Sequence, residues 1–257
     1  MPCHGLRLYQ RFLRGYSFAR GEVRLQALIL WLVLCVGAYT GRRAREREYR
    51  EMKASPRIKI CGITRVEDGL TAVESGADAI GLVFYRKSSR YVAVEQAVEI
   101  VQDLPPFVSV VGLFVDASDE LIGSVLEAVP LSLLQFHGNE PEIECARWGI
   151  RYMKAFRVRP GISVIGMVAP YPTACGYLLD SYKHGEAGGT GESFDWDLIP
   201  RGLNKPVVLA GGLSPDNIAQ AIDRVRPYGV DVSSGVESRP GIKDHDKIKA
   251  FIKAARR

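Results

Sequence analysis

From residue 57 to the C-terminus, short apolar runs alternate with longer segments in which apolar residues recur every three or four positions. The runs have the character of buried strands, and the segments between them have the spacing of amphipathic helices. The predicted strands span residues 57–63, 79–85, 108–115, 131–137, 152–158, 177–180, 207–213 and 230–233. The predicted helices span residues 66–75, 94–104, 119–129, 141–148, 215–225 and 244–255, with weaker segments at 162–169 and 196–199.

Strands that alternate with helices predict a parallel α/β protein. The near-continuous Val, Ile and Leu character of the strands fits burial on both faces. The roughly 200 residues after Met52 match the lower end of the size range of a single (β/α)8 barrel. We therefore predict a TIM barrel over residues 52–257. An open doubly wound sheet is the alternative, which is disfavoured because no GxGxxG motif follows the first strand.

The first 51 residues differ in composition from the rest, since they contain ten arginines, four glutamates and no lysine. This segment carries a formal charge of +6 in a chain whose total is +5, so residues 52–257 are close to neutral. The positive net charge of the chain therefore comes from this segment, and it is no evidence that the barrel binds nucleic acid. We predict that residues 1–51 form an extension outside the barrel.

An apolar run at residues 27–39 lies between arginines of this extension, and three interpretations of it stay open. As a transmembrane helix, the run is shorter than the ~20 residues that are needed to cross a bilayer. It suits the core of a signal peptide with cleavage after Ala38. Alternatively, translation begins at Met52, which we favour because the first strand follows closely and the barrel needs nothing upstream. We expect a cytoplasmic protein, with membrane contact only if the extension is present.

The five cysteines and four histidines show neither a CxxC pair nor the spacing of a zinc site. Neither a metal site nor a disulfide framework is predicted. An odd number of cysteines suits free thiols in a reducing cytosol. We interpret Cys145 and Cys175 as structural.

Cys61 ends the first predicted strand, and Gly62 lets the chain turn sharply after it. Thr64 and Glu67 have the spacing of a capping box for the helix that follows. In parallel barrels chemistry occurs at the carboxyl ends of strands, which makes Cys61 a candidate nucleophile or base. The alternative is a small buried hydrophobic residue.

Asp180 ends the sixth predicted strand directly after Leu178 and Leu179. Apolar surroundings disfavour the charged form of a carboxyl group, so Asp180 is a candidate general acid. A helix-capping or salt-bridged aspartate is the alternative. Asp231 lies in the eighth strand, and Arg90 follows the second strand, where it could clamp a substrate carboxylate or remain solvated.

Glycines follow three predicted strands: residues 188–191 after the sixth, Gly211 and Gly212 after the seventh, and Gly235 behind Ser234 after the eighth. Glycine lets backbone N–H groups converge on an anion, and the loops after strands 7 and 8 of a TIM barrel frequently bind phosphate. Turn geometry alone is the alternative. We expect the last two loops to bind phosphate, so that aspartate at Gly212 or Gly235 would weaken substrate binding far more than folding.

Eight groups of residues along the chain are similar to the motifs of one enzyme family. They lie at residues 59–64, 81–85, 88–91, 135–138, 178–180, 188–196, 209–213 and 231–237. No single motif is decisive, but their number and order make the combination specific. Residues 57–257 resemble phosphoribosylanthranilate isomerase, a TIM-barrel enzyme of tryptophan biosynthesis.

The resemblance implies an Amadori rearrangement of N-(5-phosphoribosyl)anthranilate to 1-(2-carboxyphenylamino)-1-deoxyribulose 5-phosphate. It implies a small phosphorylated substrate, no metal and no organic cofactor. We further expect no nucleic-acid partner, and a monomer or homodimer. Cys61 would be the general base and Asp180 the general acid. Arg90 would bind the carboxylate of anthranilate, and His137 and Asp231 would contact the substrate.

Two other classes of function compete with this one. Another phosphosugar barrel, such as an indole-glycerol-phosphate synthase or a histidine-pathway isomerase, would need a lysine at a strand end or aspartates on strands one and five, whereas strand one carries Cys61. A silent barrel that only binds phosphorylated ligands is the other, and the presence of both Cys61 and Asp180 argues against it.

Overall fold

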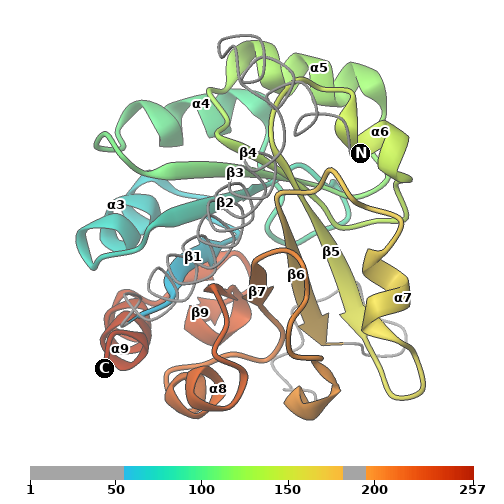
Figure 1. Cartoon of the computed structure of the whole chain (residues 1–257). Coiled ribbons are helices and arrows are strands. Elements are labelled where there is room, and N and C mark those ends of the chain that lie inside the picture. The colour runs from blue at the N-terminus through green and yellow to red at the C-terminus, as the bar shows by residue number, and fades with distance from the viewer. Residues whose placement is uncertain (1–54, 182–194) are drawn as a thin grey trace, which may run out of the picture. The chain divides into compact units, whose positions relative to one another are not determined.

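The computed structural model describes residues 55–181 and 195–257 (Figure 1). The predicted extension over residues 1–51 and the glycine passage at 188–191 lie outside the described residues. The chain divides after Ala54 into two units, and the second, Ser55–Arg257, contains every element described below.

Eight parallel strands form a closed barrel in the order in which they occur along the chain. They are β1 (Arg57–Cys61), β2 (Ala79–Val83), β3 (Ser109–Phe114), β4 (Leu133–Phe136), β5 (Tyr152–Val158), β6 (Gly176–Ser181), β7 (Val207–Leu209) and β8 (Gly229–Val232). Each strand pairs with the next, and β1 pairs with β8 to close the barrel. The predicted (β/α)8 fold is confirmed, and the alternative of an open sheet is wrong.

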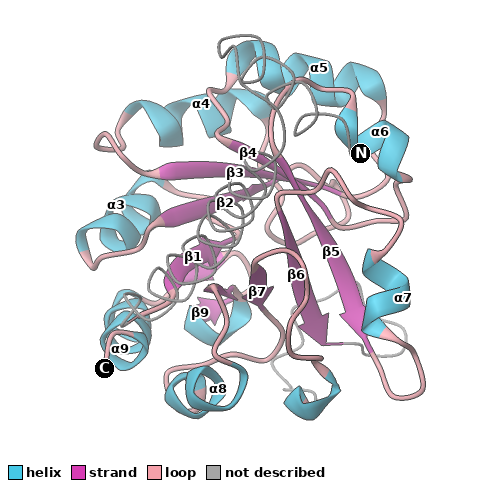
Figure 2. Ribbon diagram, viewed as in Figure 1, coloured by secondary structure: helices cyan, strands magenta, loops and turns pink. Residues whose placement is uncertain are grey.

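Helices surround the barrel on its outer face (Figure 2). They are α3 (Val66–Glu74), α4 (Val94–Gln102), α5 (Asp119–Ala128), α6 (Glu142–Ala146), α7 (Val164–Val168), α8 (Ile218–Val225) and α9 (His245–Ala255), with the 3-10 turns η1 (Trp196–Leu198) and η2 (Ser234–Val236). A hairpin of β9 (Glu237–Arg239) and β10 (Ile242–Lys243) precedes α9 and was not predicted. Within residues 55–181 and 195–257, no helix combines the length and the apolar character needed to cross a bilayer.

The strands bury both faces, and β1 shows how. Ile58 and Ile60 are fully buried in the layer between the barrel and the helices. Because successive side chains alternate, Lys59 and Cys61 point into the barrel interior. Fully burying each isoleucine stabilises the fold by roughly 1.5–3 kcal/mol.

Two local predictions are wrong. The strand predicted over residues 207–213 ends at Leu209, because Gly211 and Gly212 have φ angles of +83° and +63° that a strand cannot contain. Thr64 does not cap α3, whose N-cap is Arg65. The Thr64 hydroxyl instead donates to the carbonyl oxygen of Gly241, which ties the loop after β1 to the β9–β10 hairpin.

Candidate active site

A pocket of about 500 Å³ opens at the carboxyl ends of the barrel strands. Among the residues that line it are Cys61, Arg90, His137, Asp180, Gly211, Gly212, Asp231 and Ser234. These side chains and loops come from strands 1, 2, 4, 6, 7 and 8 or directly follow them. The fold therefore brings all the predicted site residues together around one pocket, except Gly235.

Gly235 supports the pocket from behind. A Cβ atom on this residue would lie 1.9 Å from the backbone oxygen of Leu213, which is far inside any real contact. The loop after β8 therefore packs directly on the loop after β7, and only glycine fits between them. The expectation that aspartate at Gly235 would spare folding is wrong, because any side chain there pushes the two loops apart.

Cys61 ends β1 with its side chain buried beside Val83 and Leu113. Burial raises the pKa of the thiol, and the negative charge of Asp231 raises it further. The ammonium groups of Lys59 and Lys243 lower the pKa and offset part of this effect. The thiol form is therefore favoured at rest, and the two neighbouring ammonium groups lower the free energy needed to form the thiolate.

Lys59 is a buried cation that connects three strands. Its Nζ lies 3.0 Å from both carboxylate oxygens of Asp231 and 3.0 Å from Oε1 of Gln135. Lys59 and Asp231 are paired residues in the β1–β8 register, so the two charges meet where the barrel closes. Burial would lower the pKa of Lys59, but Asp231 and Cys61 more than offset it, and the pKa is raised.

His137 and Asp180 lie together on the other side of the pocket. Nδ1 of His137 is 3.1 Å from Nε2 of Gln135, and Nε2 of His137 is 3.3 Å from Oδ2 of Asp180. The loop that carries His137 is held from behind by the buried Lys154, which donates to the carbonyl oxygen of Gly138 at 2.8 Å. A rigid support of this kind is what a side chain needs if it is to hold a reacting group.

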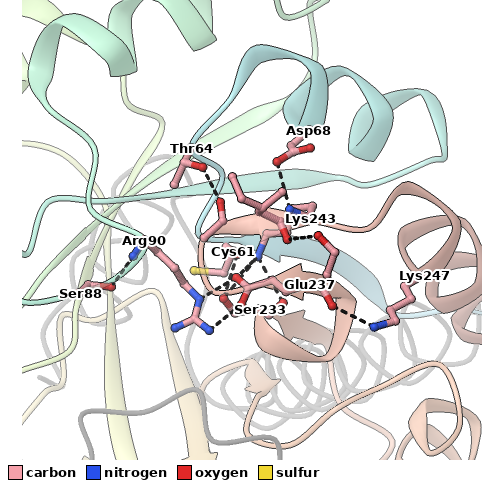
Figure 3. A network of polar contacts seen from close by, with 12 residues as sticks. Cys61, Thr64, Asp68, Ser88, Arg90, Ser233, Glu237, Lys243 and Lys247 are labelled. Atoms are coloured by element: carbon pink, nitrogen blue, oxygen red, sulfur yellow. Dashed lines mark hydrogen bonds and ion pairs between the residues drawn. The ribbon is translucent and has the colours of Figure 1, made fainter.

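Arg90 is fixed by a buried carboxylate (Figure 3). Its Nε and Nη2 donate to the two oxygens of Glu237, each at 2.8 Å, and Glu237 also accepts from Lys243 at 3.0 Å. Burial alone would raise the pKa of Glu237, but these two cations lower it below its usual value. The guanidinium has five N–H donors, so this pairing leaves donors for a substrate carboxylate.

The two loops predicted to bind phosphate both line the pocket. The turn after β7 is stabilised by Asn217, whose side-chain amide donates to the carbonyl oxygen of Gly212 at 2.8 Å. Within the described part of the chain, the N–H groups of Gly212 and Ser234 donate to no other group. Two such donors beside a pocket suit a bound anion.

The other two described thiols lie away from the pocket. Cys145 is fully buried on α6, and its burial raises its pKa to about 12. Cys175 precedes β6, and burial raises its pKa as well. Both are free, in keeping with their interpretation as structural residues.

The sequence model of the family described as N-(5'phosphoribosyl)anthranilate (PRA) isomerase matches residues 58–254. The chain belongs to the phosphoribosylanthranilate isomerase family. The N-(5'-phosphoribosyl)anthranilate isomerase of Pseudomonas fluorescens strain Pf0-1 is 62% identical over 200 residues, which cover 78% of this chain and 98% of that protein. The chain is accordingly an isomerase of tryptophan biosynthesis.

Solved phosphoribosylanthranilate isomerases have the same fold. One is a complex with reduced 1-(o-carboxyphenylamino)-1-deoxyribulose 5-phosphate, with a TM-score of 0.67 and 44% identity, covering 78% of this chain and 98% of that one. Another contains monomers derived from the dimeric enzyme of Thermotoga maritima, with a TM-score of 0.66, 43% identity and the same coverage. Monomeric and dimeric forms therefore both occur among relatives of this barrel.

Sequence reasoning assigned no role to four polar residues of this isomerase pocket and its surroundings. They are Lys59, Gln135, Glu237 and Lys243, all of them buried. The sequence does mark Lys59 and Gln135, because each interrupts an apolar strand. An unpaired polar side chain would be costly there, so each must have a buried partner. Glu237 and Lys243 lie in the hairpin that the hydrophobic pattern did not predict.

Proposed function

We propose that the pocket rearranges N-(5-phosphoribosyl)anthranilate to 1-(2-carboxyphenylamino)-1-deoxyribulose 5-phosphate, with Asp180 as general acid and Cys61 as general base. The observation that carries the proposal is the meeting of this acid and this thiol in one pocket. The same pocket offers a cation, Arg90, and a pair of loops suited to phosphate. A relative that holds a reduced form of the product supports this class of substrate.

The substrate is a closed furanosylamine, and its ring must open before the carbon skeleton can isomerise. Asp180 donates its proton to the ring oxygen while the lone pair of the aniline nitrogen forms a C=N bond to C1. The C1–O bond breaks, and the product is an open-chain iminium. A positioned acid of this kind contributes about 10²–10⁴-fold to a rate.

The iminium makes the proton on C2 acidic. The Cys61 thiolate removes that proton, and the C2–H electron pair forms the C1=C2 bond of an enolamine as the iminium nitrogen becomes neutral. The enolamine then tautomerises: the C2 hydroxyl loses its proton as C2 becomes a ketone, and C1 gains a proton. Lys59 favours this step because its ammonium group stabilises the thiolate.

Both ends of the substrate are anions, and each needs donors in the pocket. Arg90, held in place by Glu237, receives the anthranilate carboxylate. The N–H groups of Gly212 and Ser234, supported by Gly211 and Gly235, receive the phosphate. Holding both ends fixes the reacting carbons between acid and base, which converts binding energy into rate.

Substitution of the acid and of the base tests the proposal. We expect Cys61→Ala and Asp180→Asn each to lower kcat by at least ~10²-fold with a small change in KM. Loss of anthranilate-type fluorescence reports the reaction, and Cys175→Ala serves as the thiol control because Cys175 lies outside the pocket. A folded Cys61→Ala or Asp180→Asn protein with near-normal kcat would show that the role given to that residue is wrong.

A further inference from the structure

A continuous series of polar side chains crosses the barrel interior from β8 to β6. Asp231 contacts Lys59, Lys59 contacts Gln135, Gln135 contacts His137, and His137 lies beside Asp180. The proposed function uses Lys59 and Asp180 from this series and gives no task to Gln135 at its centre. Gln135 is nevertheless completely buried, so the orientation of its amide is set by its neighbours.

The orientation of the Gln135 amide follows from the chemistry of Lys59. An ammonium group has only donors, so the amide atom 3.0 Å from Nζ must be the oxygen. Asp231 holds Lys59 through both carboxylate oxygens at 3.0 Å, so the ammonium cannot turn to another acceptor without leaving a buried carboxylate unpaired. A flipped amide would set NH₂ against NH₃⁺, so that two donors face each other.

The orientation of the amide in turn decides which nitrogen of His137 carries the proton. The amide nitrogen of Gln135 can only donate, and it lies 3.1 Å from Nδ1 of His137. Nδ1 must therefore present its lone pair. A neutral imidazole has one N–H group, so that group is on Nε2.

The Nε2–H of His137 is buried beside Asp180. It lies 3.3 Å from Oδ2 of Asp180 without hydrogen-bond geometry, and it has no hydrogen-bond partner within residues 55–181 and 195–257. We propose that Gln135 is a positioning residue that locks His137 as the Nε2–H tautomer, so that His137 presents an N–H group, and not a lone pair, to Asp180. This inference rests on the proposed function of the pocket.

The tautomer matters because Asp180 must keep its proton for the ring oxygen. With a proton on Nε2, His137 has no lone pair to offer Asp180, so the acidic proton of Asp180 stays available to the ring oxygen. With a lone pair on Nε2, His137 would accept the proton of Asp180 and withhold it from the substrate. Lys59 thus serves the acid, through Gln135 and His137, as well as the thiol.

Nitrogen-15 NMR of the full chain labelled at histidine reads the tautomer directly. Two-bond correlations from the ring protons separate a protonated from an unprotonated nitrogen, and the signals lost in His137→Asn assign His137 among the four histidines. We expect Nε2 protonated and Nδ1 unprotonated at neutral pH. The opposite pattern, or a mixture of both tautomers, would overturn the inference without any variant.

Gln135→Glu replaces the donor that faces Nδ1 with an acceptor. We expect the proton to move onto Nδ1 and kcat to fall by about 10-fold, the scale seen when a partner that orients a functional side chain is removed. Gln102→Glu on the exposed face of α4 makes the same chemical change away from the pocket. It should change neither the position of the proton on His137 nor kcat. If Gln135→Glu is folded and the His137 pattern does not change, Gln135 does not set the tautomer.

The NMR pattern and the activity of the Cys61 and Asp180 variants are independent readings. If Cys61→Ala and Asp180→Asn remain active, the proposed function fails, whatever the tautomer. If those variants are inactive and His137 is protonated on Nδ1 in the unaltered chain, only the inference about Gln135 fails.

Discussion

Gly81 is the residue whose substitution tests the placement of the thiol most sharply. It is the β2 residue paired with Cys61 in the barrel register. A Cβ atom on Gly81 would lie 2.8 Å from Sγ of Cys61 and 3.0 Å from Cε of Lys59. Gly81→Ala therefore adds one methyl group directly against the proposed base and the cation that stabilises its thiolate.

The size of the effect follows from these distances. Ordinary contact begins at 3.4 Å, so Sγ must move by about 0.6 Å to accept the methyl group. A misplacement of 1 Å costs on the order of 10²-fold in rate, and we therefore expect kcat to fall by roughly 10-fold. Overpacking should lower the free energy of unfolding by about 1–3 kcal/mol. KM should change little, because Arg90 and the phosphate loops are not displaced.

The fluorescence assay measures kcat and KM, and urea unfolding measures stability. Gly123→Ala on α5 is the matched control, because no atom lies within 4 Å of the added Cβ. This control should keep its activity and gain about 0.4–1 kcal/mol of stability, since alanine restricts the unfolded chain more than glycine does. A folded Gly81→Ala protein with unchanged kcat would refute the tight placement of the thiol.

Four further results are expected. Because burial raises the pKa of Cys61, the rise of kcat with pH should lie on the alkaline side of an ordinary thiol's range, and a rise in the acid range would contradict a thiolate base. Glu237→Gln should raise KM more than it lowers kcat, since Arg90 loses its charged anchor; equal KM values would remove Glu237 from substrate binding. Gly212→Asp should weaken substrate binding by charge repulsion, and an unchanged KM would place the phosphate elsewhere. A chain lacking residues 1–51 should keep its activity by the same assay, and loss of folding would show that the extension belongs to the barrel domain.

The hydrophobic pattern was sufficient for the fold because a parallel barrel buries both faces of every strand. Each predicted strand exists, and errors are confined to ends such as residues 210–213. There the apolar composition continues beyond β7, but the positive φ angles of Gly211 and Gly212 end the strand. Backbone angles of this kind are set by the close packing of neighbouring loops, which no local pattern records.

The candidate site could be predicted only where a residue's place in its own strand suggests its role. Cys61 and Asp180 stand at strand ends, where position alone suggests chemistry. Gln135 lies inside a strand, and its task depends on Lys59, which is 76 residues away in the chain. Such a contact follows from the register of β1, β4 and β8 around the closed barrel. Thr64 is an error of the opposite kind, because a local pattern predicted a contact that does not form. Its spacing from Glu67 is that of a capping box, but its hydroxyl donates to the carbonyl oxygen of the distant Gly241.

The pairing of Lys59 with Asp231 also constrains how the chain reaches its native state. The two residues are separated by 172 positions, so at about 5–20 residues per second the lysine emerges from the ribosome roughly 10–30 s before its partner. During that interval β1 has no β8 to pair with, and a compact intermediate that enclosed Lys59 would bury an uncompensated charge. We expect the nascent chain to keep its first strand hydrated until the last strand is made, so that ring closure is a late and cooperative event.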